Sequence, residues 1–290
     1  MQTQHPPPHV LTADIGGSHL TAGIANFSTN AVIPESVISA EVMSKGTAKE
    51  ILHGWIMGLQ AVMKINDHPL AGLAVAMPGP FDYDRGISYI KGLDKYEAIF
   101  GMDIKRHLAD ALAMEPDRVR FRNDAECAIA GEVLAGAGKG YNKVIGITLG
   151  TGFGSAFSVE KITKDLNLGS DPHGSSIADD YFSTRWFVKR YAALRDQLLT
   201  GGVKELAALA EKSDQAKQVF DEFADGLGAF LLKVTKKLQP EVLVIGGNIA
   251  GAADLFLPRL KRNLGPLPVR LGQLGAQSPL IGAAAIFKEP

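Results

Sequence analysis

The sequence has 290 residues, enough for two domains of ordinary size. Hydrophobic residues make up 46% and charged residues 21%, which is typical of a globular protein and excludes wholesale disorder. Lys and Arg number 30 against 31 Asp and Glu, so the net charge is −1 and gives no bulk attraction to nucleic acid or to an anionic membrane. We therefore expect partners of neither kind.

A single cysteine, Cys127, excludes a disulfide framework and a cysteine-based zinc site. It also favours a reducing compartment. No run approaches the roughly 18 apolar residues that a membrane span needs. The first ten residues lack the charged and apolar regions of a signal peptide. We expect a cytoplasmic protein.

Short apolar runs bounded by Gly, Asp, Asn or Pro predict strands. In chain order these runs are His9–Ile15, Leu20–Phe27, Leu73–Met77, Arg118–Arg122, Lys143–Leu149, Phe153–Val159 and Glu241–Ile245. Apolar residues at helical spacing predict helices between them. These segments are Thr47–Ile65, Ile104–Met114, Asp124–Ala137, Thr184–Leu199 and Asp214–Leu238. Strands that alternate with helices predict an α/β fold.

Two parts of the sequence resemble each other. Val10–Phe27 and Val144–Val159 each read as a strand, a turn of small residues and a second strand, where an α/β protein would normally have a crossover helix. Two such hairpins predict a duplicated α/β unit, with the boundary near Asn123 and Asp124.

The first candidate site follows the first strand. Asp14 ends that strand, and Gly16, Gly17 and Ser18 follow. Glycines let backbone N–H groups approach a phosphate, the serine hydroxyl can donate to it, and the aspartate can hold a hydrated Mg²⁺. A plain hairpin turn explains the same residues equally well.

The second candidate site is the run Gly150-Thr151-Gly152-Phe153-Gly154-Ser155. It lacks the lysine of a Walker A loop, and a strand follows it in place of a helix, which argues against the P-loop and Rossmann readings. A tight turn is the alternative. The same kind of turn at the equivalent place in both halves makes a phosphate-binding role the stronger interpretation.

Three further motifs follow strands, where α/β folds place ligands. Asn123 and Asp124 end a strand and start a helix, so Asp124 is a candidate catalytic carboxylate; from these residues alone, capping of the helix is the favoured role. Pro78-Gly79-Pro80 and Gly246-Gly247-Asn248 are the other two, and an ordinary loop explains each.

Taken in order, these pieces resemble the ROK family of sugar kinases and repressors, within the actin, hexokinase and Hsp70 superfamily. The resemblance covers nearly the whole chain, and the order of the motifs is more specific than any one of them. The segments that carry it are DIGGS at Asp14, PGP at Pro78, FRNDAECAIAGE at Phe121, GITLGTGFGSAF at Gly146, DDYFSTRWFVKRY at Asp179, EVLVIGGNIA at Glu241 and PLIGAAAIF at Pro279.

The resemblance implies an α/β fold of two ribonuclease-H-like (actin-like ATPase) domains that flank a cleft. We expect residues 1–123 to form the first domain and residues 124–278 the second, with a C-terminal helix within 279–290 that packs back onto the first domain. It also implies a homodimer. Because the first predicted strand begins at His9, we expect no DNA-binding helix-turn-helix domain before it.

The resemblance also implies a phosphoryl transfer from ATP, with Mg²⁺, to a hexose hydroxyl. Asp124 would be the general base, and Asp14 would position the Mg²⁺ or its waters. The sugar contacts implied are Gly79, Asn123, Asp124, His173 and Asp179. The nucleotide contacts implied are Asp14, Gly16, Gly17, Ser18, Gly150, Thr151, Gly152, Gly246, Gly247 and Asn248.

The sequence departs from the family in one segment, residues 165–180. The zinc-binding C-x-C-G-x-x-G-C motif is absent, so we expect no zinc site. Ser170 stands where the family has a glutamate before its histidine, here His173, and Asp179 stands where it has a second glutamate. Glucose is therefore not assumed. Alternatives are polyphosphate as donor, an amino sugar such as N-acetylmannosamine as acceptor, or a weakly catalytic regulator that binds sugar or nucleotide.

Overall fold

A computed structural model describes residues 7–195 and 199–288. Contacts divide the chain into two compact units. The described residues of unit 1 are 7–135 and 276–288, and those of unit 2 are 136–195 and 199–275. Among all these residues, no helix has the length and apolar character that a membrane crossing requires.

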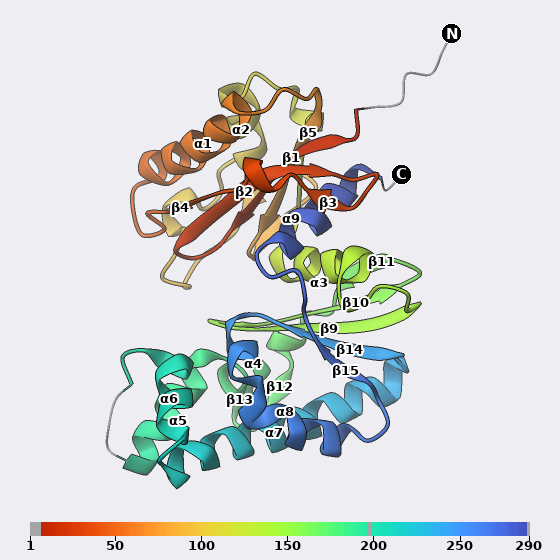
Figure 1. Cartoon of the computed structure of the whole chain (residues 1–290). Coiled ribbons are helices and arrows are strands. Elements are labelled where there is room, and N and C mark those ends of the chain that lie inside the picture. Colours follow the sequence, from red (N-terminus) through yellow and green to blue (C-terminus); the bar gives the residue numbers. More distant parts are fainter. Residues whose placement is uncertain (1–6, 196–198, 289–290) are drawn as a thin grey trace. The chain divides into compact units, whose positions relative to one another are not determined.

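Unit 1 is built on a six-stranded mixed sheet (Figure 1). Its central strand, β1, runs antiparallel to β2 and parallel to β5, which in turn runs parallel to β8; β3 and β4 both pair with β2. The strands are β1 (His9–Ile15), β2 (His19–Asn26), β3 (Ala31–Val32), β4 (Ile38–Glu41), β5 (Leu70–Met77) and β8 (Val119–Asn123). A small hairpin of β6 (Phe81–Asp82) and β7 (Ile87–Ser88) follows β5.

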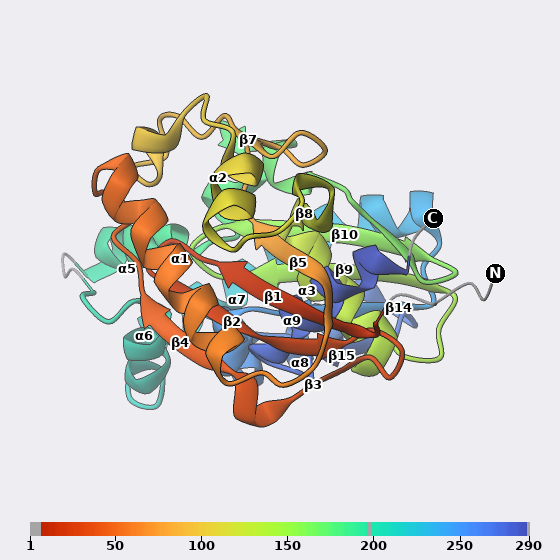
Figure 2. The same ribbon diagram turned by 90° about the horizontal axis from the view of Figure 1, so that it is seen from above.

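Helices cover both faces of this sheet, as the two views agree (Figures 1 and 2). On one face lie α1 (Ala48–Lys64) and α2 (Ile104–Ala111), whose apolar residues join the core of the sheet. On the other face lie α3 (Asp124–Ala135) and α9 (Gln277–Ala284). Helix α9 packs against β1, β2 and β5. Residues 289 and 290 of the segment expected to form this helix lie outside the described residues.

Close packing of α3 on α9 explains why the units divide after Ala135 and not at the expected position after Asn123. A Cβ atom on Gly282 would lie 1.8 Å from the carbonyl oxygen of Cys127, and one on Gly131 would lie 2.0 Å from that of Ser278. The two backbones therefore touch, which only glycine permits. Helix α3 belongs with unit 1 for this reason, and the division before Ala276 places all of α9 there too.

Unit 2 repeats the topology of unit 1. Its five strands lie in the order β11-β10-β9-β14-β15, with β10 antiparallel to β9 and β14 parallel to it. They are β9 (Lys143–Leu149), β10 (Phe153–Val159), β11 (Ile162–Asp165), β14 (Val242–Gly246) and β15 (Val269–Leu271). In both units the chain enters at the central strand, turns back through a hairpin and later adds two parallel strands, so the predicted duplication is present.

Four helices of unit 2 bury one common core with its sheet. They are α5 (Thr184–Arg195), α6 (Gly202–Ala210), α7 (Asp214–Leu238) and α8 (Ala253–Leu264). This core contains a cluster of aromatic rings, and Phe182, Phe187 and Phe223 are among its fully buried members. The short elements β12 (Pro172–His173), β13 (Ser176–Ile177) and α4 (Ala178–Tyr181) connect β11 to α5. The predicted helix Thr184–Leu199 runs into residues 196–198, which lie outside the described residues.

Candidate active site

The predicted site residues of unit 1 gather at one edge of its sheet. Strands β1, β5 and β8 are parallel neighbours, and Asp14 pairs with Ala76 while Met77 pairs with Asn123. The carboxyl ends of the three strands therefore meet, which is where open α/β sheets bind ligands. This edge carries Asp14 and the turn after it, the Pro78–Pro80 loop, and Asn123 with Asp124.

Two carboxylates, those of Asp14 and Asp124, share this edge and interact electrostatically. Burial raises the pKa of the Asp14 carboxyl, the nearby charge of Asp124 raises it further, and together they bring it to about 7. A pair of carboxylates that repel each other at a strand edge is the electrostatic arrangement that a divalent cation relieves. The donor chemistry of Asp14 therefore fits a magnesium ion.

The turn after Asp14 is a hairpin turn that leaves its tip exposed. The Gly16 amide donates to the His19 carbonyl at 2.9 Å, and Gly17 and Ser18 are exposed. From below, the hydroxyl of buried Tyr96 donates to the Gly16 carbonyl. The hairpin interpretation is thus correct as local structure, and it leaves the tip open for a phosphate, because a Cβ on Gly17 would meet no atom closer than the Lys95 side chain at 3.5 Å.

A tyrosine joins two of the three predicted sugar contacts of unit 1, Gly79 and Asn123. The Asn123 side-chain amide donates to the Tyr83 hydroxyl at 3.2 Å, and that hydroxyl donates to the Met77 carbonyl at 3.2 Å. A Cβ atom on Gly79 would lie 3.3 Å from the same hydroxyl. Gly79 and Asn123 therefore both lie next to the Tyr83 hydroxyl. Sequence reasoning missed Tyr83, because only the fold brings it to these two motifs.

Capping of α3 falls mainly to Asn123. Its side-chain oxygen accepts from the Glu126 amide at 3.0 Å, the spacing of an N-cap residue, whereas Asp124 Oδ1 accepts from the adjacent Ala125 amide at 2.8 Å. The favoured capping role for Asp124 is therefore largely taken by its neighbour. Beneath this helix start, buried Arg122 and Glu126 form an ion pair of 3.1 Å that fixes the first turn.

The two predicted nucleotide motifs of unit 2 also meet at the carboxyl ends of parallel strands. Gly246 pairs with Thr148, so the Gly246–Asn248 turn and the Gly150–Gly152 loop leave the same sheet edge. Gly247 has a φ of 86°, and a Cβ on it would lie 2.3 Å from the Leu149 carbonyl oxygen. Only glycine permits this approach. Thr151, Gly152, Gly247 and Asn248 are exposed, which leaves their backbone groups accessible to a ligand.

The last two predicted sugar contacts lie in unit 2. Asp179 Oδ1 accepts from the Phe153 amide at 2.6 Å, and Oδ2 pairs with Arg185 at 2.5 Å. His173 is half-buried among aromatic rings, with its centroid 4.8 Å from that of Tyr181 and 5.0 Å from that of Phe182. Burial and the charge of Lys233 lower the pKa of His173. Within residues 7–195 and 199–288, no hydrogen bond reaches the His173 ring.

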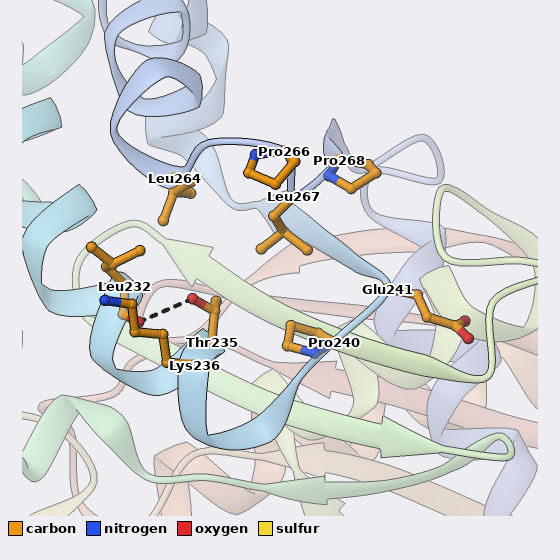
Figure 3. Close-up of a pocket in the computed structure, with 9 residues that line it drawn as sticks. All are labelled: Leu232, Thr235, Lys236, Pro240, Glu241, Leu264, Pro266, Leu267 and Pro268. Carbon is orange, nitrogen blue, oxygen red and sulfur yellow. Dashed lines mark hydrogen bonds between the residues drawn. The ribbon is translucent and has the colours of Figure 1, made fainter.

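A pocket of about 440 Å³ in unit 2 lies at the opposite end of β14 from these motifs. Leu232, Leu264 and Leu267 line it together with three prolines, while Glu241 points away from them (Figure 3). The Glu241 carboxylate accepts from the Asn142 amide at 2.7 Å. The pocket lies at the amino end of β14 and has a mainly apolar lining, so it is a poor candidate for a phosphate site.

Comparison with known proteins agrees with the family resemblance seen in the sequence. The model of the ROK family matches residues 10–165. A glucokinase of Streptomyces coelicolor is 23% identical over an alignment that covers 97% of this chain and 98% of that protein. An N-acetyl-D-glucosamine kinase of Histophilus somni is also 23% identical, with 94% of this chain and 97% of that protein covered.

The fold is also similar to that of solved ROK family structures. The crystal structure of a ROK family glucokinase from Streptomyces griseus, in complex with glucose and AMPPNP, superposes with a TM-score of 0.77. The two chains are 20% identical, and the match covers 96% of this chain and 98% of that one. This likeness confirms the two-domain α/β fold of the actin-like ATPase type that the sequence predicted.

Proposed function

The chain belongs to the ROK family, and we propose that it is a sugar kinase, which transfers a phosphoryl group from ATP to a hydroxyl of a hexose. The observation that carries the proposal is the pair of carboxylates, Asp14 and Asp124, at the strand edge of unit 1. The kinase names of the full-length relatives support it.

Asp124 is proposed as the general base. A sugar hydroxyl is a poor nucleophile, so Asp124 accepts its proton as the new oxygen–phosphorus bond forms and the bond to ADP breaks; such catalysis typically contributes about 10²–10⁴-fold. The Ala125 amide orients one oxygen of this carboxylate. Asn123, which Tyr83 fixes, and the backbone at Gly79 are proposed to hold the sugar.

Asp14, Gly16, Gly17 and Ser18 are the proposed phosphate contacts of unit 1, with Asp14 as the Mg²⁺-binding carboxylate. A bound Mg²⁺ would neutralise charge on the transferring phosphoryl group. Phosphoryl transfer depends chiefly on position and charge, so a turn with an open tip beside a carboxylate is suited to it. In unit 2, Gly150, Thr151 and Gly152 are the proposed phosphate contacts, and Gly246, Gly247 and Asn248 the proposed nucleoside contacts.

An N-acetylhexosamine is the second candidate acceptor. The N-acetyl-D-glucosamine kinase relative covers nearly the whole chain at the same identity as the glucokinase, so the comparisons favour neither sugar. The segment 165–180 bears on this choice, because Ser170 and Asp179 stand where the family has glutamates. The hydroxyl of exposed Ser170 here donates to the side-chain oxygen of Asn167 at 3.0 Å.

The test is formation of a sugar phosphate, followed by mass spectrometry, over a panel of hexoses and N-acetylhexosamines with Mg²⁺ and ATP. Polyphosphate replaces ATP in a parallel series, and the Asp124→Ala variant is the control. Turnover of one sugar that the variant loses would support the kinase and identify its acceptor. Turnover only with polyphosphate would show that polyphosphate, and not ATP, is the donor. Binding of sugar or nucleotide without turnover would favour a regulator.

A further inference from the structure

We infer that Asp179 and Arg185 position the Gly150–Phe153 loop for the phosphates of the donor. This inference rests on the proposed function, because it takes that loop as a phosphate site. It differs from the role that family resemblance implies for Asp179, and it adds Arg185, to which the sequence analysis assigned no role. Both are positioning residues.

Both oxygens of the Asp179 carboxylate are committed within unit 2. Oδ1 accepts from the Phe153 amide at 2.6 Å, directly after the exposed Gly152. Oδ2 lies 2.5 Å from Arg185 Nη2. Hydrogen bonds that involve a charged partner are about twice as strong as neutral ones. Asp179 therefore has two strong local partners, the Phe153 amide of the loop and the Arg185 guanidinium.

The segment after Asp179 attaches to the same loop at two more points. The Thr184 amide and its hydroxyl donate to the Gly150 carbonyl at 2.8 and 2.9 Å. Arg185 Nη1 reaches the Thr151 carbonyl at 3.5 Å. The loop is thus held at Gly150, Thr151 and Phe153 by three residues of one short segment. A loop held at each end keeps the amides of its tip in one orientation, which phosphate recognition requires.

The length of the aspartate side chain suits this role. A Cβ atom on Gly152 would already lie 3.0 Å from Asp179 Oδ1, so the carboxylate lies directly against the loop backbone. A glutamate, which is one methylene longer, would have to bend away or push the loop outward. The shorter residue at this position therefore fits a contact that ends at the loop.

Equilibrium binding of Mg²⁺ with AMPPNP, measured by isothermal titration calorimetry, tests the inference without turnover. Asp179→Ala should weaken AMPPNP binding by at least about tenfold, the effect of losing a hydrogen bond to a charged group. Asp179→Asn keeps an acceptor for the Phe153 amide and should lose less. Asp214→Ala is the matched control, because Asp214 is an exposed carboxylate of the same unit that pairs with Lys217 in the first turn of α7, and its affinity should stay within about twofold of wild type.

Two readouts separate a positioning role from other roles. Hydrogen exchange at the Phe153 amide should speed up in Asp179→Ala, while the melting temperature shows that unit 2 remains folded. For the acceptor that turnover identifies, the KM should change less than about twofold in Asp179→Ala while the KM for ATP rises.

An unchanged AMPPNP affinity with a raised sugar KM would overturn the inference and leave the kinase proposal intact. Wild-type protein that binds no AMPPNP would overturn both.

Discussion

Asp14 and Asp124 share one strand edge of unit 1, and the charge of Asp124 adds to burial in raising the pKa of Asp14 to about 7. The ordinary value for this group is 3.8. Asp14 is therefore about half protonated near neutral pH in the ligand-free protein. The shift links its protonation both to folding and to cation binding.

The first prediction concerns stability and pH. Because the folded pKa lies above the unfolded one, the native state binds more protons between pH 3.8 and about 7, and its stability falls as pH rises through that window. Asp14→Asn removes this ionisable group. The free energy of unfolding of the variant, relative to that of wild type, should therefore be higher at pH 8 than at pH 5. Urea denaturation at the two pH values measures this. An equal pH dependence of stability in the two proteins would contradict the raised pKa of Asp14.

The second prediction concerns proton release. A cation that binds Asp14 requires its ionised form, so binding of Mg²⁺ with AMPPNP at pH 7 should release about half a proton from this group. Calorimetry in two buffers of different ionisation enthalpy counts the protons, after correction for AMPPNP itself. Asp14→Asn should release fewer by this amount. The same count in both proteins would show that Asp14 is not the cation ligand.

Local pattern was enough to predict the elements that carry the site. Strands His9–Ile15, Lys143–Leu149 and Phe153–Val159 have the predicted bounds, because each apolar run ends at a glycine or at a polar residue. The duplicated hairpins also follow from local sequence. These features depend on neighbours in the chain, so no tertiary information is needed to find them.

Contacts between distant residues were not predictable in this way. Tyr83, Tyr96 and Arg185 reach their partners through the fold. Tyr83 and Arg185 lie beside or within segments that the sequence singled out, but their partners Asn123 and Thr151 are distant in the chain, as Gly16 is from Tyr96. Strand β15 was missed because three residues carry too little periodicity. The division after Ala135 depends on contact between α3 and a helix at the other end of the chain.

The third prediction tests that helix contact. Gly282→Ala would bring a Cβ to 1.8 Å from the Cys127 carbonyl oxygen, so α9 must move away from α3. We expect a loss of at least about 2 kcal/mol of stability in urea denaturation, within the range for overpacked cores. Gly54→Ala in α1 is the control, because its Cβ meets nothing within 4 Å and should stabilise the helix by about 0.5–1 kcal/mol. Equal stability of Gly282→Ala and wild type would rule out this packing.

The fourth prediction concerns His173. Phenylalanine should fit among the rings of Tyr181, Phe182 and Phe230, so His173→Phe should keep the melting temperature within a few degrees. If the His173 ring hydrogen-bonds the sugar, as the family resemblance implies, the sugar KM should rise by roughly 2–10-fold. Because the pKa of His173 is lowered, the wild-type KM should be constant from pH 7 to 8. An unchanged KM in the variant would make His173 a packing residue only.

The most direct test of the central claim compares wild type with Asp124→Asn, a variant of the same shape that cannot accept a proton. The measurement is kcat at saturating sugar and Mg²⁺ with ATP, together with the affinities for sugar and for AMPPNP. The account predicts that kcat falls by at least about 10²-fold while both affinities stay within a few-fold of wild type. A variant with undiminished kcat would contradict the assignment of Asp124 as the base.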